Sequence, residues 1–232
     1  MTRKFLDGFG ILILAQLMVS INIVGSKYLL PTIPILLLLT LRFLLSAGLL
    51  LPLHWVTKKN SGYQDLKTLN KKDWLFILAQ ALSAGVFFNG LMLLGLNYTS
   101  ANAAGIITSA LPAIIAVMSF LILKEYFSKR KSLCVGLATL GLLITSFDQF
   151  FGIQENHSLS GDCLIFLSLI PEASYYILSK LHPNRLPIFL ISGIVNAINA
   201  IVLLPLVIFF VSLDAVKISA FGSMILIIVC MT

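Results

Sequence analysis

Charged side chains are scarce in this sequence, and their scarcity decides the class of protein. Asp, Glu, Lys and Arg make up 11% of the 232 residues, whereas apolar residues make up 59% and the mean hydropathy is +1.01. A chain of this composition cannot cover a water-soluble surface with polar groups. The sequence therefore predicts an all-α polytopic membrane protein whose first partner is the lipid bilayer.

Motifs for catalysis, metal binding and nucleotide binding are also missing from the sequence. The three cysteines, Cys134, Cys163 and Cys230, lie far apart in apolar runs without a C-x-x-C pair or a partner histidine, so we interpret them as packing residues. The sequence has no G-x-x-x-x-G-K-[ST] motif, no catalytic carboxylate set and no histidine cluster. We therefore expect no enzyme activity and no cofactor.

Long apolar runs, by contrast, follow one another along nearly the whole chain. At a rise of 1.5 Å per residue, about 20 residues cross a hydrocarbon layer of about 30 Å. Seven of the runs are long enough to span with modest help at their ends, and the eighth is cut short by the C-terminus. The runs lie at 5–26, 33–56, 74–96, 101–123, 132–150, 162–181, 186–212 and 218–232.

The basic residues between these runs predict the orientation of the chain. The net charge of +7 does not indicate nucleic acid as a partner, because the Lys and Arg residues form no soluble stripe with interleaved aromatics. If each run spans once, nearly all of them fall on one side, with Lys27 and Lys217 as the exceptions. The loop 151–160 has no Lys or Arg. By the positive-inside rule the N-terminus is cytoplasmic and this loop is external.

An internal repeat relates the two ends of the sequence. A shift of 153 residues without gaps superposes glycines, a Ser-Lys pair and two prolines, which are less common coincidences in such a chain than leucine matches. Five runs separate the copies, so the second copy enters the membrane from the opposite face, as in inverted-topology repeats of secondary transporters. The matched positions are Gly8 with Gly161, Ser26-Lys27 with Ser179-Lys180, Pro34-Ile35 with Pro187-Ile188, and Leu50–Leu53 with Leu203–Leu206.

This repeat predicts a first five-helix unit at 1–150, an external loop at 151–160 and an incomplete second unit at 161–232. The second unit has no counterpart of the run at 101–123, in which Ala101, Gly105, Ser109 and Ala113 line up small side chains for close packing. We therefore expect a truncated product that is unstable or inactive unless another chain completes it.

Local signals predict where helices begin and bend. The polar turn 97–100 can cap the helix that follows it. Pro112, Pro171 and Pro205 lie inside predicted spans, where each removes a backbone hydrogen bond and bends or opens its helix. A break at Pro171 would free backbone carbonyls beside the acidic side chain of Glu172.

Two ionisable residues fall near the middle of predicted spans. An ionised side chain there costs about 2.5–3.5 kcal/mol on insertion scales, so it normally faces a cavity or a partner. Arg42 and Glu172 lie at similar depths, which permits a contact between them. Glu125 and Lys124 lie at the inner interface and are read as a gating or solvated ion pair.

Polar uncharged side chains extend this pair into a candidate translocation path. Asn196 and Asn199 fall in the same central layer, Asn22, Asn89 and Asn102 lie nearer the outer end, and Tyr175 falls on the shifted copy of Asn22. For each asparagine the alternative is a structural hydrogen bond between helices, worth about 0.6 kcal/mol. With Arg42 and Glu172, the candidate path residues are Asn22, Asn89, Asn102, Tyr175, Asn196 and Asn199.

The run GLNYTSANAAGIITSALPAIIAVMSFLILKE resembles the signature of the EamA-type transporters of the drug/metabolite transporter superfamily. The matching positions are Gly95, Leu96, Tyr98–Ala101, Pro112 and Glu125. The chain departs from the signature at Lys124 and Tyr126, where that family usually has Gly and Arg. Asn22, Lys27 and Arg42 also fall where such residues are usual in it.

The resemblance implies a ten-helix protein of two five-helix repeats in a bacterial inner membrane. Together with the repeat and the central polar layer, it indicates a secondary transporter that moves a small organic metabolite or drug by alternating access. A coupling proton or ion is left open, as is a dimer or a completing chain. The alternative is a truncated, non-transporting membrane protein that acts only in assembly or interaction.

Overall fold

The computed structural model describes residues 2–57, 69–124, 133, 135–137, 140–141, 158–183 and 186–211, and every element in this part of the chain is a helix. Two helical rods, Lys71–Tyr98 and Ala101–Leu123, are divided into shorter elements. The predicted run 218–232 and most of 132–150 lie outside the described residues. The undivided helices are α1 (Thr2–Leu29), α2 (Ile35–Thr57), α8 (Leu159–Leu181) and α9 (Ile188–Phe210).

Five stretches of the described residues are long and apolar enough to cross a membrane, which confirms the all-α polytopic fold. Their bounds lie within a few residues of the predicted runs, as Ile35–Thr57 does against 33–56. Helix α8 begins at Leu159 and so takes in the end of the stretch predicted as an external loop. The division of the chain into two repeats stays a prediction. The five stretches are Ile35–Val56, Lys71–Tyr98, Ala101–Leu123, Leu159–Leu181 and Ile188–Phe210.

The rod Lys71–Tyr98 changes its helical type at its centre. It consists of α3 (Lys71–Gln80), a seven-residue π-helix η2 (Ala81–Phe87) and α4 (Phe88–Tyr98). A π-helix bonds each N–H to the fifth residue back; it is rare, and it is frequently found at functional sites. Its middle residue, Ala84, is one of the two middle residues of the whole rod, Ala84 and Gly85. The change of helical type therefore lies at the depth of the bilayer centre.

The rod Ala101–Leu123 is interrupted just before its proline, as predicted. Helix α5 (Ala101–Thr108) ends at Ser109, and α6 begins at Leu111 with Pro112 in its first turn. The Ser100 hydroxyl caps α5 by accepting a hydrogen bond from the Ala103 N–H at 3.1 Å, which confirms the predicted capping turn. In α8 and α9, by contrast, the helix continues through Pro171 and Pro205, so the expected break beside Glu172 does not form.

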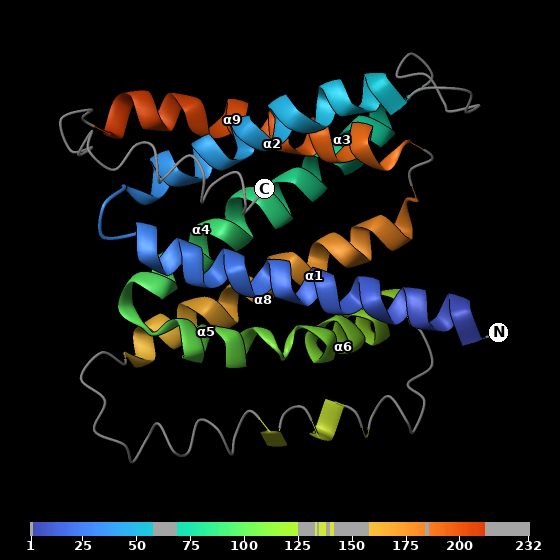
Figure 1. Cartoon of the computed structure of the whole chain (residues 1–232), viewed down its shortest axis with the longest axis vertical. Coiled ribbons are helices and arrows are strands. Elements are labelled where there is room, and N and C mark those ends of the chain that lie inside the picture. The colour runs from blue at the N-terminus through green and yellow to red at the C-terminus, as the bar shows by residue number, and fades with distance from the viewer. Residues whose placement is uncertain are drawn as a thin grey trace.

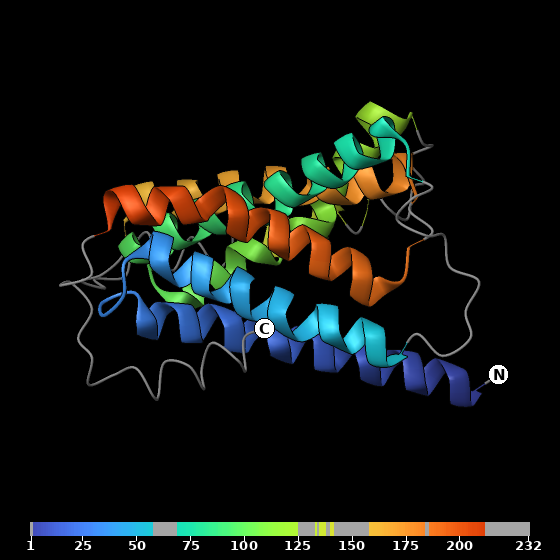
Figure 2. The ribbon, with the colours of Figure 1, turned by 90° about the horizontal axis from the view of Figure 1, so that it is seen from above.

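Helices α2 and α9 pack side by side along their lengths and run in opposite directions (Figures 1 and 2). Both ends of α9 lie 153 residues after the corresponding ends of α2, which is the shift of the sequence repeat. Helix α4 packs mainly against α8, and α1, α5 and α6 lie on that side of the bundle (Figure 1). The rod Lys71–Tyr98 therefore stands between the α2–α9 pair and α8.

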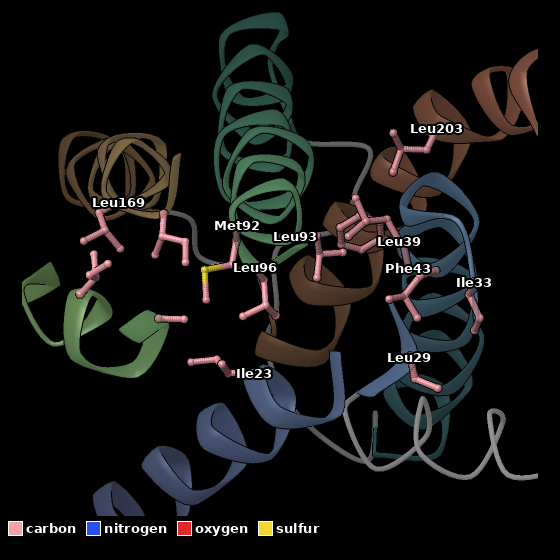
Figure 3. Close-up of a cluster of buried hydrophobic side chains, with 14 of the residues drawn as sticks. Ile23, Leu29, Ile33, Leu39, Phe43, Met92, Leu93, Leu96, Leu169 and Leu203 are labelled. Carbon is pink, nitrogen blue, oxygen red and sulfur yellow. The ribbon is translucent and has the colours of Figure 1, made fainter. Parts of the chain in front are cut away.

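The apolar core lies where these helices meet (Figure 3). Leu39 and Phe43 of α2 approach Leu93 of α4 and Leu203 of α9, while Leu96 and Met92 of α4 face Leu169 of α8. Leu38, Leu96, Ile165 and Leu169 are fully buried. Many large apolar side chains on the outer faces stay exposed, as expected of a surface solvated by lipid.

The close helix contact falls at a different place from the one predicted. A Cβ on Gly95 of α4 would stand 2.7 Å from the carbonyl oxygen of Gly161 of α8, so the two backbones nearly touch there. Gly105 has no heavy atom within 4 Å of its Cβ position, and Ser109 is exposed. Gly105 and Ser109 therefore have no close neighbour among the described residues, whereas Ala104 beside them is buried in the core. Close packing of a further segment on this face stays a prediction.

Candidate functional site

A cavity of about 300 Å³ lies between α2, the rod Lys71–Tyr98, α8 and α9. It sits near mid-depth, since Ala84 and Gly85 are the middle of their rod and Asn199 is the middle residue of α9. Its volume falls at the lower end of the range for small-molecule sites in proteins. The polar side chains that line it are Arg42, Ser46, Gln80, Asn89, Tyr175, Ser192, Asn196 and Asn199.

Five of the predicted path residues meet at this cavity. Arg42 comes from α2, Asn89 from α4, Tyr175 from α8, and Asn196 and Asn199 from α9. They come from distant parts of the sequence and share only their depth in the membrane. The sequence placed Arg42, Asn196 and Asn199 near the centre, Asn89 nearer the outer end, and Tyr175 on the shifted copy of Asn22.

Two of these asparagines are bonded within their own helices. The Asn89 amide nitrogen donates to the carbonyl oxygens of Ala84 at 2.8 Å and Gly85 at 3.0 Å. The Asn196 amide nitrogen donates to the Ser192 carbonyl at 2.8 Å. The bond from Asn89 reaches five residues back, so this side chain supports the π-helical backbone and lines the cavity at the same time.

Two other amides at the cavity have no partner. Gln80 is 2% exposed and Asn199 is 1% exposed, and among the described residues nothing bonds to Gln80 Nε2, Asn199 Nδ2 or Asn199 Oδ1. Leaving a buried polar group unsatisfied costs about 1–3 kcal/mol. The cavity therefore holds donor and acceptor groups that the described residues do not use.

Gly85 allows the Asn199 side chain to reach this position. A Cβ on Gly85 would stand 1.8 Å from Asn199 Nδ2 and 2.2 Å from Asn199 Cγ, far inside van der Waals contact. The amide of α9 therefore lies directly on the backbone of the π-helix. Only glycine leaves room for it there.

Arg42 and Glu172 do not form an ion pair in the described part of the chain, and Glu172 does not line the cavity. The contact that their depth permitted is absent because the rod Lys71–Tyr98 stands between their helices. Helix α2 packs on α9, whereas α8 packs on α4 and η2 of the rod. Ser83 of η2 donates a hydrogen bond to the Pro171 carbonyl and so connects the π-helix to α8 beside Glu172. Glu172 is half-buried, one helical turn from Tyr175.

The other predicted residues that the structure describes, Asn22, Asn102 and Lys124, do not line the cavity. Asn22 is half-buried and accepts a hydrogen bond from the Ser26 hydroxyl at 3.5 Å, and Asn102 is exposed. Lys124 ends α6 in the left-handed conformation, with φ 53°. Glu125 lies outside the described residues. Of the three asparagines expected nearer the outer end, Asn89 lines the cavity and Asn22 and Asn102 do not.

The sequence analysis missed three polar lining residues: Gln80, Ser46 and Ser192. Gln80 carried the signal that selected Asn89, a polar amide inside a long apolar run. The two serines carried little signal, because a serine inside a membrane helix commonly bonds to its own backbone.

A second polar contact connects the first turn of α3 to the residue that follows α8. His182 Nε2 lies 2.5 Å from Asp73 Oδ1, and the His182 ring stacks on Phe76 with 4.6 Å between centroids. Asp73 Oδ2 also accepts the Asn70 N–H at 2.7 Å. Within the described residues, no three His, Cys, Asp or Glu side chains gather in a way that could hold a metal ion.

Comparison with known proteins identifies the family. The model of the EamA-like transporter family matches residues 7–147. The chain belongs to the EamA-like transporter family. This assignment and the apolar helices make it an integral multi-pass membrane protein of a transporter family, and the family is one of transporters rather than enzymes.

Curated relatives of this EamA-like chain are also named as transporters. It is 29% identical over 212 residues to the uncharacterized transporter YetK of Bacillus subtilis, a match that covers 90% of this chain and 62% of YetK. It is 27% identical over 153 residues to an uncharacterized transporter of Methanothermobacter thermautotrophicus, covering 65% of this chain and 44% of that protein. The chain thus spans less than two thirds of the length of these relatives.

Proposed function

We propose that this chain carries the substrate site of a secondary transporter that moves a small organic molecule across a bacterial inner membrane by alternating access. The observation that supports the proposal is the polar cavity at mid-depth, in a family of transporters. A polar cavity in the middle of a bilayer has no structural advantage, because apolar side chains would fill the same volume at lower cost. A site for a transported molecule gives these polar groups a use.

The helices around the cavity have the features that alternating access requires. Transporter sites near the midplane are commonly built by interrupted helices at the interface of inverted repeats. Here the π-helix η2 interrupts one rod at the cavity, and the antiparallel pair α2 and α9 supplies corresponding helices of the proposed repeats 1–150 and 161–232. Rocking of these repeats would open the cavity to each side in turn.

Glu172 is the proposed site for a coupling proton. It is half-buried in α8, one turn from Tyr175 of the cavity, and forms no ion pair in the described part of the chain. Protonation would remove its charge, and the cost of burying that charge, during the transport cycle. Under this proposal Glu172→Gln transports without the pH dependence of the unmodified protein.

Transport by the purified chain in lipid vesicles tests the function. Vesicles are incubated with a bacterial metabolite extract, and the compounds that enter are identified by mass spectrometry against protein-free vesicles. Ser192→Leu places an apolar side chain in the cavity and is expected to abolish uptake. Ser174→Leu is the matched control, because Ser174 bonds to its own helix on α8 and does not line the cavity.

Selective uptake that Ser192→Leu abolishes and Ser174→Leu retains would support the proposal. A folded protein that moves no compound would favour the alternative, a membrane protein acting only in assembly or interaction. Equal uptake by the two variants would show that transport does not depend on this cavity.

A further inference from the structure

The cavity carries one positive charge and no negative one. Arg42 is the charged side chain among the described residues that line it, and no Asp or Glu lines it. Arg42 has no ion-pair or hydrogen-bond partner in the described part of the chain. A cation without a partner in a membrane interior is costly, so an anion that enters the cavity would relieve that cost.

The amides around Arg42 divide into two groups. Asn89 and Asn196 donate to carbonyls of their own helices, whereas Gln80 Nε2 and Asn199 Nδ2 have no acceptor. The unused donors therefore lie on the same cavity as the unpaired guanidinium. Together they offer N–H groups to a ligand that is rich in acceptor oxygens.

We propose that this cavity binds the carboxylate of a small organic anion. Arg42 pairs with the carboxylate, and the Gln80 and Asn199 amides donate to its oxygens. Asn199 Oδ1, which also has no partner, accepts an N–H or O–H from the rest of the ligand. The proposal rests on the proposed function, since it names the substrate class of the same site.

Charge and volume favour a carboxylate over a larger or more highly charged ligand. One guanidinium matches a single carboxylate in a planar, bidentate arrangement, whereas a phosphate monoester carries about −1.5 to −2 charges at pH 7. At about 30 Å³ per water molecule in the liquid, a cavity of about 300 Å³ holds about ten water-sized groups. The ligand is therefore a small carboxylate of about ten non-hydrogen atoms.

Binding to the purified full chain in nanodiscs tests the substrate class. The probes are the monocarboxylates lactate, 3-hydroxybutyrate and benzoate, each beside its neutral primary amide, with inorganic phosphate and choline as further ions. We expect at least one carboxylate to bind about 10-fold or more tightly than its amide. Arg42→Gln should weaken that binding about 10- to 100-fold, because charge-assisted hydrogen bonds are the strong ones. Lys72→Gln removes one positive charge at the exposed start of α3 and should leave binding unchanged.

A second variant protects the test against misfolding of Arg42→Gln. Gln80→Leu replaces an unbonded buried amide by an apolar side chain of similar size, so the variant should fold at least as stably as the unmodified protein. It should also bind the carboxylate several-fold more weakly. Higher stability with weaker binding is not expected from a residue with only a packing role.

The outcomes separate this proposal from the proposed function. If no carboxylate binds better than its amide, or if Gln80→Leu and Arg42→Gln bind it normally, the carboxylate site is wrong. If phosphate or choline binds and depends on Arg42, the ligand class is wrong. If a neutral compound is transported and Arg42→Gln still transports it, the proposed transport function is supported and the carboxylate site is wrong. If a carboxylate binds but does not cross the membrane, the carboxylate site is supported and the proposed transport function is wrong.

Discussion

Replacing Gly85 by alanine tests whether the Asn199 amide lies on the π-helix. The added Cβ would stand 1.8, 2.2 and 2.4 Å from Asn199 Nδ2, Cγ and Oδ1, where ordinary contact is 3.4–4 Å. Overpacking of this kind costs about 1–3 kcal/mol. At about 2–4 °C per kcal/mol for a chain of this length, Gly85→Ala should lower the apparent Tm by about 2–12 °C.

The measurement is thermal unfolding of the purified protein in detergent, with two comparisons built into the chain. Asn199→Ala removes all three clashing atoms, so adding it to Gly85→Ala should recover most of the lost stability. Gly90→Ala lies five residues further along the same rod, where nothing stands within 4 Å, and should gain about 0.5–1 kcal/mol from helix propensity. A Gly85→Ala protein that melts no lower than Gly90→Ala, or a double variant that melts no higher than Gly85→Ala, would show that the two residues do not touch.

Two further predictions concern the ends of the helices. Lys124 adopts a left-handed φ of 53° that glycine accepts without strain, so Lys124→Gly should raise the free energy of unfolding by about 1 kcal/mol, whereas a lowered Tm would show that its side chain is needed there. In a background with the three native cysteines replaced by alanine, Ser158→Cys should react with a membrane-impermeant thiol reagent on intact cells and Asn70→Cys should not. The reverse pattern would contradict the cytoplasmic N-terminus.

The sequence predicted where the helices lie along the chain better than it predicted which helices pack together. Apolar length and turn signals located α2 and α9 to within a few residues, and Pro112 marked the interruption between α5 and α6. These features depend on residues that are close together in the sequence, so they can be read from it directly. The π-helix was not predicted, because its sequence ALSAGVF lacks proline and reads as ordinary helix. Its contacts with Asn199 and Pro171 come from other helices.

The site shows the same division between local and long-range information. Depth along a span follows from residue number, and Arg42, Asn196 and Asn199, which were placed near the centre in this way, line one cavity together with Asn89 and Tyr175. Depth does not fix which helices are adjacent. The contact that depth permitted between Arg42 and Glu172 is therefore absent among the described residues, since the rod Lys71–Tyr98 separates α2 from α8.

The scarcity of polar residues is what makes depth informative in this protein. In a water-soluble helix a glutamine or asparagine has a solvated face to occupy, so its position says little about a site. In a membrane span the same side chain bonds within its helix, as Asn89 and Asn196 do, bonds to a neighbouring helix, or remains unsatisfied, as Gln80 and Asn199 are among the described residues. An unsatisfied amide could be replaced by leucine with a gain in stability. We therefore propose a ligand as the common partner of these amides and of Arg42, which has no partner among the described residues.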